Sequence, residues 1–448
     1  MTKQFLASIV ARAMLAGPQE IGSIIERVRQ TAGHRGLPGI SRRYLEAFAK
    51  RSHPRRREVI QFLLNDPGFQ RLRVSSRKAN VSAIESWPQP VMRPSEAAEA
   101  WSIPPILTTG DLSARLRLTP TELDWLADSK QLTVRPSAAR LHHYYYSAVR
   151  KRSGASRLIE SPKQHLKLLQ RQILRDILNG IPSHPAAHGF IRGRSIRTFA
   201  SPHVDQRIVL RMDIENFFPS ITASRVAAFF RTAGYPEPVA DALANLCCNA
   251  VPEHVLKKLE IAQEDKSRDA DIRSMYLRTH LPQGAPTSPA LANICAYRLD
   301  CRLQGLAAAS GAVYTRYADD LAFSGGEVFE RSVNRFADHV GAILLEEGFC
   351  ANYRKTRIQR RSTRQQLAGL IVNQRLNTPR REFDTLKAIL TNCIRLDPAS
   401  QNRDQVSDFR AHMLGRIVFV ESIHPSRGAK LRNLFDQIIW SDSFRADS

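Results

Sequence analysis

Two adjacent acids, Asp319 and Asp320, stand between two short stretches in which apolar and polar residues alternate. The alternation over 313–317 and again over 321–323 predicts two strands, with the turn of a tight β-hairpin at 318–320. Neighbouring carboxylates repel each other, so the pair gains no stability from its place at the tip of a hairpin. A divalent cation would use both carboxylates, and we therefore expect a metal site at this tip.

A third acid, Asp213, ends an apolar run at 207–212 that reads as a buried strand. An ionised carboxylate at such a position costs free energy unless it is paired or binds a metal. The alternative is an aspartate that caps the following helix, and the residues alone leave the two interpretations about equal.

Two further stretches could contact a substrate. The sequence LPQGAPTSP predicts a rigid loop that presents Gln283, and residues 142–163 predict a β-hairpin with a Ser-Gly turn. Lys151 and Arg152 lie at that turn, and Arg157 follows it. These cations either cover a charged hairpin surface or hold a triphosphate, and the residues leave both interpretations open.

Three motifs, in their order along the chain, resemble those of the reverse transcriptase family. They are DIENFF at 213–218, LPQGAPTSP at 281–289 and YADD at 317–320. The resemblance runs from about Tyr144 to the C-terminus and does not cover the first 140 or so residues.

Within that family, the chain resembles bacterial retron reverse transcriptases. The matching features are QGAPTSP at 283–289, LAFS at 321–324 and AHGF at 187–190. Two positions depart from the retron pattern. The late Val-Thr-Gly triplet reads Leu-Ala-Gly at 367–369, and the Asn-Ala-x-x-His signature is stretched over 249–254. These departures concern the RNA partner rather than the polymerase chemistry.

The resemblance implies an RNA-directed DNA polymerase that transfers a nucleotide to a 3′-hydroxyl with two Mg²⁺ ions, for which Mn²⁺ is an expected substitute. By this resemblance, Asp213 and Asp319 bridge both ions and Asp320 supports the site. The backbone carbonyl of Ile214 is a further candidate ligand.

The resemblance also assigns residues to the incoming deoxynucleotide. Lys151 or Arg152, together with Arg157, is expected to hold the triphosphate. Phe218 is expected to exclude a 2′-hydroxyl, because a bulky ring leaves no room for an extra oxygen, and Gln283 to touch the nucleotide or the template.

Two assignments concern the leaving group and the primer. Lys355 either protonates or neutralises the pyrophosphate, or is only a surface cation, and these interpretations weigh about equally. Leu367, Ala368 and Gly369 are expected to form the grip on the primer end.

The composition agrees with a nucleic-acid partner. The chain has 448 residues and a formal net charge of +24, a surplus that opposes compaction unless a polyanion neutralises it. A membrane surface is a distant second interpretation. The six cysteines form no Cys-x-x-Cys pair, so we expect no zinc site and a reducing cytoplasm. No apolar run is long enough to cross a membrane.

The resemblance implies an α+β fold of the right-hand polymerase type, with fingers, a palm built on an antiparallel sheet, and a thumb. We place fingers and palm at 141–375 and a helical thumb at 376–448. A small helical module is expected at 96–140. Residues 1–95 are expected to form an extra basic, largely helical region, read either as a phosphate-contacting arm or as a solvated helical face.

The expected function is to copy a structured non-coding RNA into DNA from dNTPs, in anti-phage defence, with an effector protein as a further partner. One alternative is an RNA-binding scaffold. Another is a defence-associated reverse transcriptase that makes DNA by a protein-primed or untemplated route.

Overall fold

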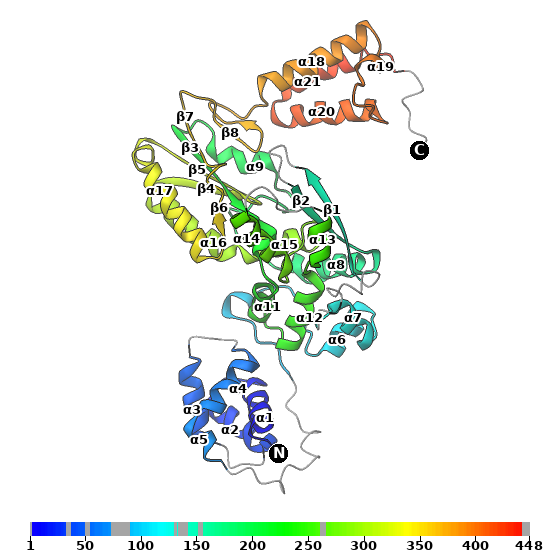
Figure 1. Cartoon of the computed structure of the whole chain (residues 1–448). Coiled ribbons are helices and arrows are strands. Elements are labelled where there is room, and N and C mark those ends of the chain that lie inside the picture. Colours follow the sequence, from blue (N-terminus) through cyan, green and yellow to red (C-terminus); the bar gives the residue numbers. More distant parts are fainter. Residues whose placement is uncertain are drawn as a thin grey trace. The chain divides into compact units, whose positions relative to one another are not determined.

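The protein is described from a computed structural model, which covers residues 2–32, 37–49, 54–72, 90–129, 132, 142–150, 156–259 and 266–440 (Figure 1). The chain divides into two compact units. The first comprises Met1–Pro182 and Phe218–Cys295, and the second comprises Ser183–Phe217 and Ala296–Ser448. The domain boundaries expected from the sequence, near 95, 140 and 375, remain predictions.

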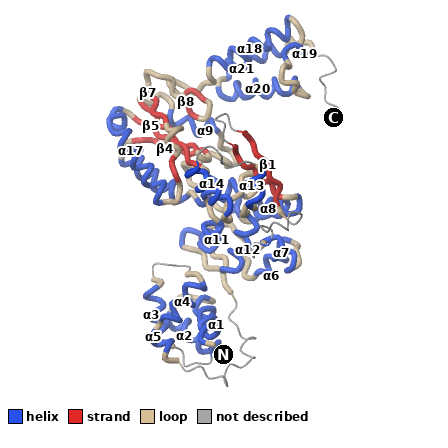
Figure 2. Tube along the Cα trace, viewed as in Figure 1, coloured by secondary structure: helices blue, strands red, loops and turns tan. Residues whose placement is uncertain are grey.

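The first unit begins with five helices that share a hydrophobic core of their own. They are α1 (Lys3–Leu15), α2 (Ile21–Ala32), α3 (Pro38–Ala47), α4 (Arg56–Asn65) and α5 (Pro67–Gln70). Leu6, Val10 and Met14 are spaced so that they lie on one face of α1, and all three are buried in this core. In the described residues before Tyr144, Figure 2 shows only helices and loops.

The rest of the first unit is a two-stranded ribbon with helices. Its elements are η2 (Glu96–Ala98), α6 (Thr109–Leu116), α7 (Pro120–Ala127), β1 (Tyr144–Arg150), β2 (Ser156–Pro162), α8 (Gln164–Asp176), η5 (Leu178–Gly180), α11 (Ala223–Thr232), α12 (Glu237–Cys247), α13 (Glu253–Lys258), α14 (Lys266–Leu277) and α15 (Ser288–Cys295). Strands β1 and β2 pair antiparallel, from Tyr144 opposite Pro162 to Arg150 opposite Ser156. Helix α10 (Phe217–Ser220) begins at the boundary between the units.

The second unit contains an antiparallel sheet with β3 at its centre. The strands are β3 (Ile208–Glu215), β4 (Ala312–Tyr317), β5 (Asp320–Gly325), β6 (Cys350–Ala351) and β7 (Arg357–Arg360). Their order is β4-β5-β3-β6, and β7 also pairs with β3. The α+β class expected from the sequence is therefore confirmed, with the antiparallel sheet at its heart.

Alternation along the strands gives this sheet two different faces. On one face, the ring of Phe323 lies 4.9 Å from that of Tyr314 and 5.0 Å from that of Phe336. Phe336 belongs to α17 (Glu327–Glu346), which lies along β3 and β5 (Figure 1). On the other face, Val209 and Ala322 share a core with residues of α9 (Ile196–Ala200).

Further helices and a small β-hairpin complete the second unit. They are η6 (Ser201–His203), α16 (Tyr297–Ala309), β8 (Gln366–Leu367), β9 (Leu370–Ile371), α18 (Arg380–Arg395), α19 (Pro398–Gln401), α20 (Phe409–Ile423) and α21 (Pro425–Phe435). Helices α18, α20 and α21 bury a separate core that includes Leu390, Ile417 and Leu431. In the described ranges, no helix combines the length and the apolar character needed to cross a membrane.

A buried ion pair joins β4 to α16. Arg316 donates from Nε to Oδ1 of Asp300 at 2.7 Å and from Nη2 to Oδ2 at 2.6 Å, and neither side chain is exposed. The hydroxyl of Tyr314 donates to the same carboxylate at 2.7 Å. Two parallel bonds of this kind fix the guanidinium in one plane and one position.

The pair predicts a large stability change when only one partner is removed. Arg316→Met should lower the free energy of unfolding by about 3–5 kcal/mol, because Asp300 would stay buried without a cation. Arg316→Met with Asp300→Asn should recover part of that loss. Urea unfolding measures both, with the exposed Arg331→Met on α17 as control. A cost for Arg316→Met no larger than that of the control would contradict the prediction.

Candidate active site

The tip of the β4–β5 hairpin is a two-residue turn. Tyr317 is opposite Asp320, so Ala318 and Asp319 form the turn, and Asp320 already belongs to β5. The expected turn at 318–320 was therefore one residue too long. Ala318 has a φ of 56°, in the left-handed region that such turns require.

Three backbone contacts hold this tip in place. The carbonyl of Asp319 accepts from the N–H of Ile214 at 2.8 Å, and that of Ala318 accepts from Nη1 of Arg316 at 3.2 Å. Gly189 lies against the tip so closely that a Cβ there would be 2.7 Å from the nitrogen of Ala318. Because these contacts surround the tip, its backbone has little room to shift.

The carboxylates of Asp213 and Asp320 emerge side by side. The two residues are directly opposite in the β3–β5 ladder, and opposite residues of an antiparallel pair point to the same face. Asp213 lies inside β3 with 4% exposure, and α10 begins only at Phe217. Asp213 is therefore not a helix cap, and the register brings all three acids to one end of the sheet.

Two cations hold two of these carboxylates. Nζ of Lys355 donates to Oδ2 of Asp213 at 2.8 Å. From β3, Nε and Nη2 of Arg211 donate to Oδ1 of Asp320 on β5 at 3.0 and 2.7 Å. Lys355 is thus placed at the acids, although about half of its side chain is exposed. Arg211 was not singled out from the sequence, where the only signal was its position two residues before Asp213.

Burial raises the pKa of the Asp319 carboxyl, and the charges of Asp213 and Asp320 raise it further. Lys355 acts in the opposite direction. An acid with a raised pKa binds a proton more readily, so a positive ion at this position would relieve a cost that the fold already bears.

The donor set suits a hard cation such as Mg²⁺, which prefers carboxylates together with substrate oxygens and water. Among the described residues, no three His, Cys, Asp or Glu side chains already converge on one point as metal ligands do. Arg211 and Lys355 instead hold two of the acids. Metal binding by Asp213, Asp319, Asp320 and the carbonyl of Ile214 remains a prediction.

In the first unit, the Gln283 loop packs on strand β2. The carbonyl of Gln283 accepts from the N–H of Glu160 at 2.9 Å. Gly284 has a φ of 131°, and a Cβ there would be 2.9 Å from the carbonyl oxygen of Glu160. Arg157 is an exposed residue of the same strand. The Gln283 loop is therefore attached to the same strand, β2, that carries Arg157.

A buried polar network below this loop was not visible in the sequence. The carboxylate of Glu160 binds Nε2 of His280 at 2.9 Å and accepts from Nδ2 of Asn249 at 2.7 Å. Burial acts to lower the pKa of His280, but the Glu160 carboxylate outweighs it, and the pKa is raised. The network therefore joins β2 to His280, which lies two residues before Pro282 at the start of the Gln283 loop.

The remaining predicted residues have different surroundings. Phe218 lies half-buried in α10. Lys151 and Arg152 lie outside the described residues. Ala368 and Gly369 form the turn of the β8–β9 hairpin, but Leu367 is fully buried in the core next to α9. A side-chain contact of Leu367 with a primer is therefore not available in this structure.

Comparison with known proteins gives consistent matches. A family model described as "Reverse transcriptase (RNA-dependent DNA polymerase)" matches residues 149–383. The retron Mx65 reverse transcriptase of Myxococcus xanthus is 37% identical over 346 residues, covering 75% of this chain and 74% of that protein. The retron Mx162 enzyme of the same organism is 32% identical over 347 residues, covering 74% and 67%. The retron Ec86 enzyme of Escherichia coli is 33% identical over 233 residues, covering 52% and 63%.

The raised pKa of Asp319 predicts how stability depends on pH. Because the folded-state pKa lies above the unfolded value, this carboxyl favours folding at low pH, and that contribution is lost as the pH rises through the folded pKa. Asp319→Asn should therefore raise the Tm of the metal-free protein at neutral pH. The gain should vanish as the pH falls towards the ordinary value of 3.8.

Thermal unfolding in EDTA across this pH range measures the effect. Asp338→Asn, which removes an exposed acid of α17, is the control. An Asp319→Asn protein that is less stable than wild type at neutral pH would show that the carboxylate is stabilised by its surroundings instead.

Proposed function

Because the chain belongs to the reverse transcriptase family and is of the bacterial retron type, we propose that this RNA-directed DNA polymerase copies a structured non-coding RNA at Asp213, Asp319 and Asp320. The observation that carries the proposal is the strand register, which sets Asp213 opposite Asp320 with Asp319 beside them. The relatives named as retron enzymes support the choice of RNA.

The chemistry proposed for the acids is in-line phosphoryl transfer from a dNTP to a 3′-hydroxyl. When bound, two Mg²⁺ ions, or Mn²⁺ in their place, would supply positive charge at the attacking and leaving oxygens. Asp213 and Asp319 would hold both ions, with Asp320 and the carbonyl of Ile214 as further oxygen ligands. Nζ of Lys355 lies 2.8 Å from Oδ2 of Asp213. Its ammonium would neutralise or protonate the pyrophosphate.

The incoming dNTP would be held by the first unit. We assign the triphosphate to Arg157 with Lys151 or Arg152, and contact with the nucleotide or template to Gln283. Phe218, five residues after Asp213, would exclude the 2′-hydroxyl of a ribonucleotide. The support for Arg157 and Gln283 is their shared attachment to β2.

The primer end and the cellular role complete the proposal. The β8–β9 turn at Ala368 and Gly369 would contact the primer through its backbone, with Leu367 as its buried anchor. We place the enzyme in the cytoplasm, in anti-phage defence, with an effector protein as a partner.

The decisive experiment is primer extension on a defined RNA template with dNTPs and Mg²⁺. The double variant Asp319→Asn with Asp320→Asn should lose at least about a hundredfold in rate, because it removes preorganised charge from the reaction. Asp338→Asn should extend as wild type does. Undiminished extension by the double variant would move the site elsewhere, and product unrelated to the template would favour the untemplated or protein-primed alternative.

Phe218→Val tests the proposed steric gate. The smaller side chain should raise incorporation of ribonucleotides relative to deoxynucleotides by at least about tenfold, because it opens room for one hydroxyl. The ratio of kcat/KM for ATP to that for dATP is the measurement. Each variant serves as its own control for folding, since both substrates are tested on one preparation. An unchanged ratio would remove Phe218 from the discrimination of sugars.

A further inference from the structure

Arg211 is positioned by its strand to act on the acids. It precedes Asp213 by two residues in β3, so both side chains emerge on the same face of the sheet. It faces Ala322 across the β3–β5 ladder, two residues from Asp320. About one third of the Arg211 side chain and one fifth of the Asp320 side chain are exposed, so the contact is only partly open to water.

We propose that Arg211 sets the affinity of the acid cluster for divalent cations, by acting as the internal counter-ion of Asp320. That the acids bind a divalent cation rests on the proposed function. The affinity for that cation is a binding constant, which can be measured without polymerisation.

The contact leaves Asp320 able to bind a cation. Both donors of Arg211 reach the same oxygen, Oδ1. In the described part of the chain, no hydrogen bond to Oδ2 of Asp320 is seen. Asp320 is thus held through one oxygen, and Oδ2 keeps its capacity to accept a further bond.

Charge explains what the arginine changes. Asp213, Asp319 and Asp320 meet two cations, Arg211 and Lys355, which leaves one formal negative charge. Without Arg211 the cluster would carry two. A divalent ion would then be attracted more strongly, and it would no longer be repelled by a guanidinium in the same cluster. This gain exceeds the loss from freeing the Asp320 side chain, which is the rotational freedom of one short residue.

The arrangement favours binding of the cation together with the substrate. A site that binds the free ion weakly completes its ligand set when triphosphate oxygens arrive, as Mg²⁺ sites with few carboxylates do. The same arginine spares the ion-free protein the full repulsion among three acids.

The test measures Mn²⁺ binding to protein free of nucleic acid and nucleotide, by the electron paramagnetic resonance signal of unbound Mn²⁺. Arg211→Met should tighten binding at least about fivefold, because it removes a cation and keeps a long side chain. Arg211→Lys, which keeps the charge, should stay near the wild-type Kd.

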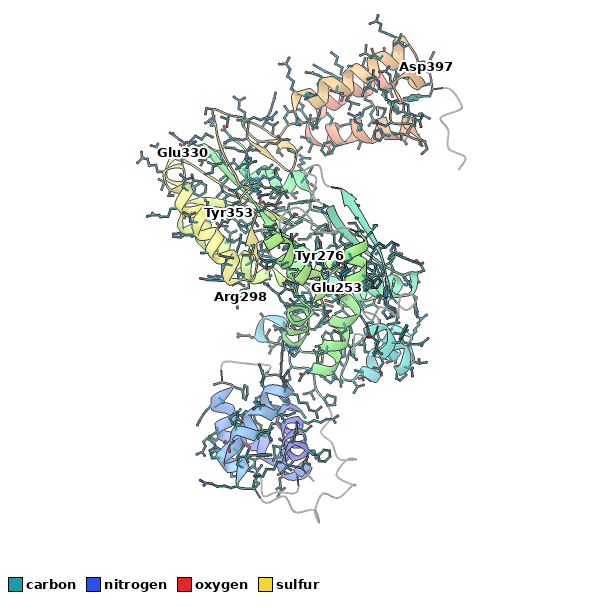
Figure 3. The ribbon with its side chains drawn as sticks, in the orientation of Figure 1. Glu253, Tyr276, Arg298, Glu330, Tyr353 and Asp397 are labelled. Carbon is teal, nitrogen blue, oxygen red and sulfur yellow. The ribbon has the colours of Figure 1, made fainter. Side chains whose placement is uncertain are left out.

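Arg207→Met is the matched control. It removes the same charge just before β3, where Arg207 pairs with Glu330, which Figure 3 labels on α17. Six residues of strand put Arg207 about 20 Å from Asp213, beyond strong influence on the cluster. Its Kd should equal that of wild type.

Two results would overturn the role of Arg211 while leaving the site intact. One is an unchanged or weaker Kd in Arg211→Met when Asp319→Asn abolishes binding. The other is a Tm loss in Arg211→Met of the same size with and without Mn²⁺, which a merely structural contact would give. If Mn²⁺ binding instead survives Asp319→Asn, the ion lies elsewhere and the proposed site itself fails.

Discussion

The buried pair of Arg316 and Asp300 is the interaction on which the arrangement of the acids depends. One guanidinium binds the carboxylate of α16 with two nitrogens and the carbonyl of Ala318 with the third. The tip carries two adjacent acids, Asp319 in the turn and Asp320 at the start of β5, and their like charges oppose each other. The pair of Arg316 and Asp300 holds this tip from the interior of the protein. Both charges are fully removed from water, so the loss of either partner would leave the other buried and unpaired.

Because side chains alternate along each strand, the two faces of the sheet have different roles. The face that contains Phe323 packs on α16 and α17 and supplies apolar burial. The opposite face carries Asp213, Arg211 and Asp320 at its end, where charges balance one another in pairs. Because the two faces are coupled through the same backbone, packing on one side fixes the geometry of charge on the other.

The sequence predicted what is local and missed what depends on distant partners. Alternation revealed β4 and β5, and the order of motifs indicated the family and the three acids, because these signals lie within a few residues. The contact of Arg211 with Asp320 spans 109 positions and that of Glu160 with His280 spans 120, so no local pattern announces either. The burial of Leu367 and the pairing of Lys355 with Asp213 likewise follow from tertiary packing.

Gly189 has a consequence for how the end of the sheet that carries the acids can adjust. With its backbone against Ala318 on one side and Arg316 bound to the carbonyl of Ala318, the hairpin tip is clamped. The main chain therefore acts as a fixed frame, and adjustment to an arriving charge falls to side-chain torsions, above all those of Asp320 and its arginine. Side-chain torsions change faster than a packed sheet can rearrange, so adjustment at this end of the sheet is set by rotamers rather than by movements of the fold.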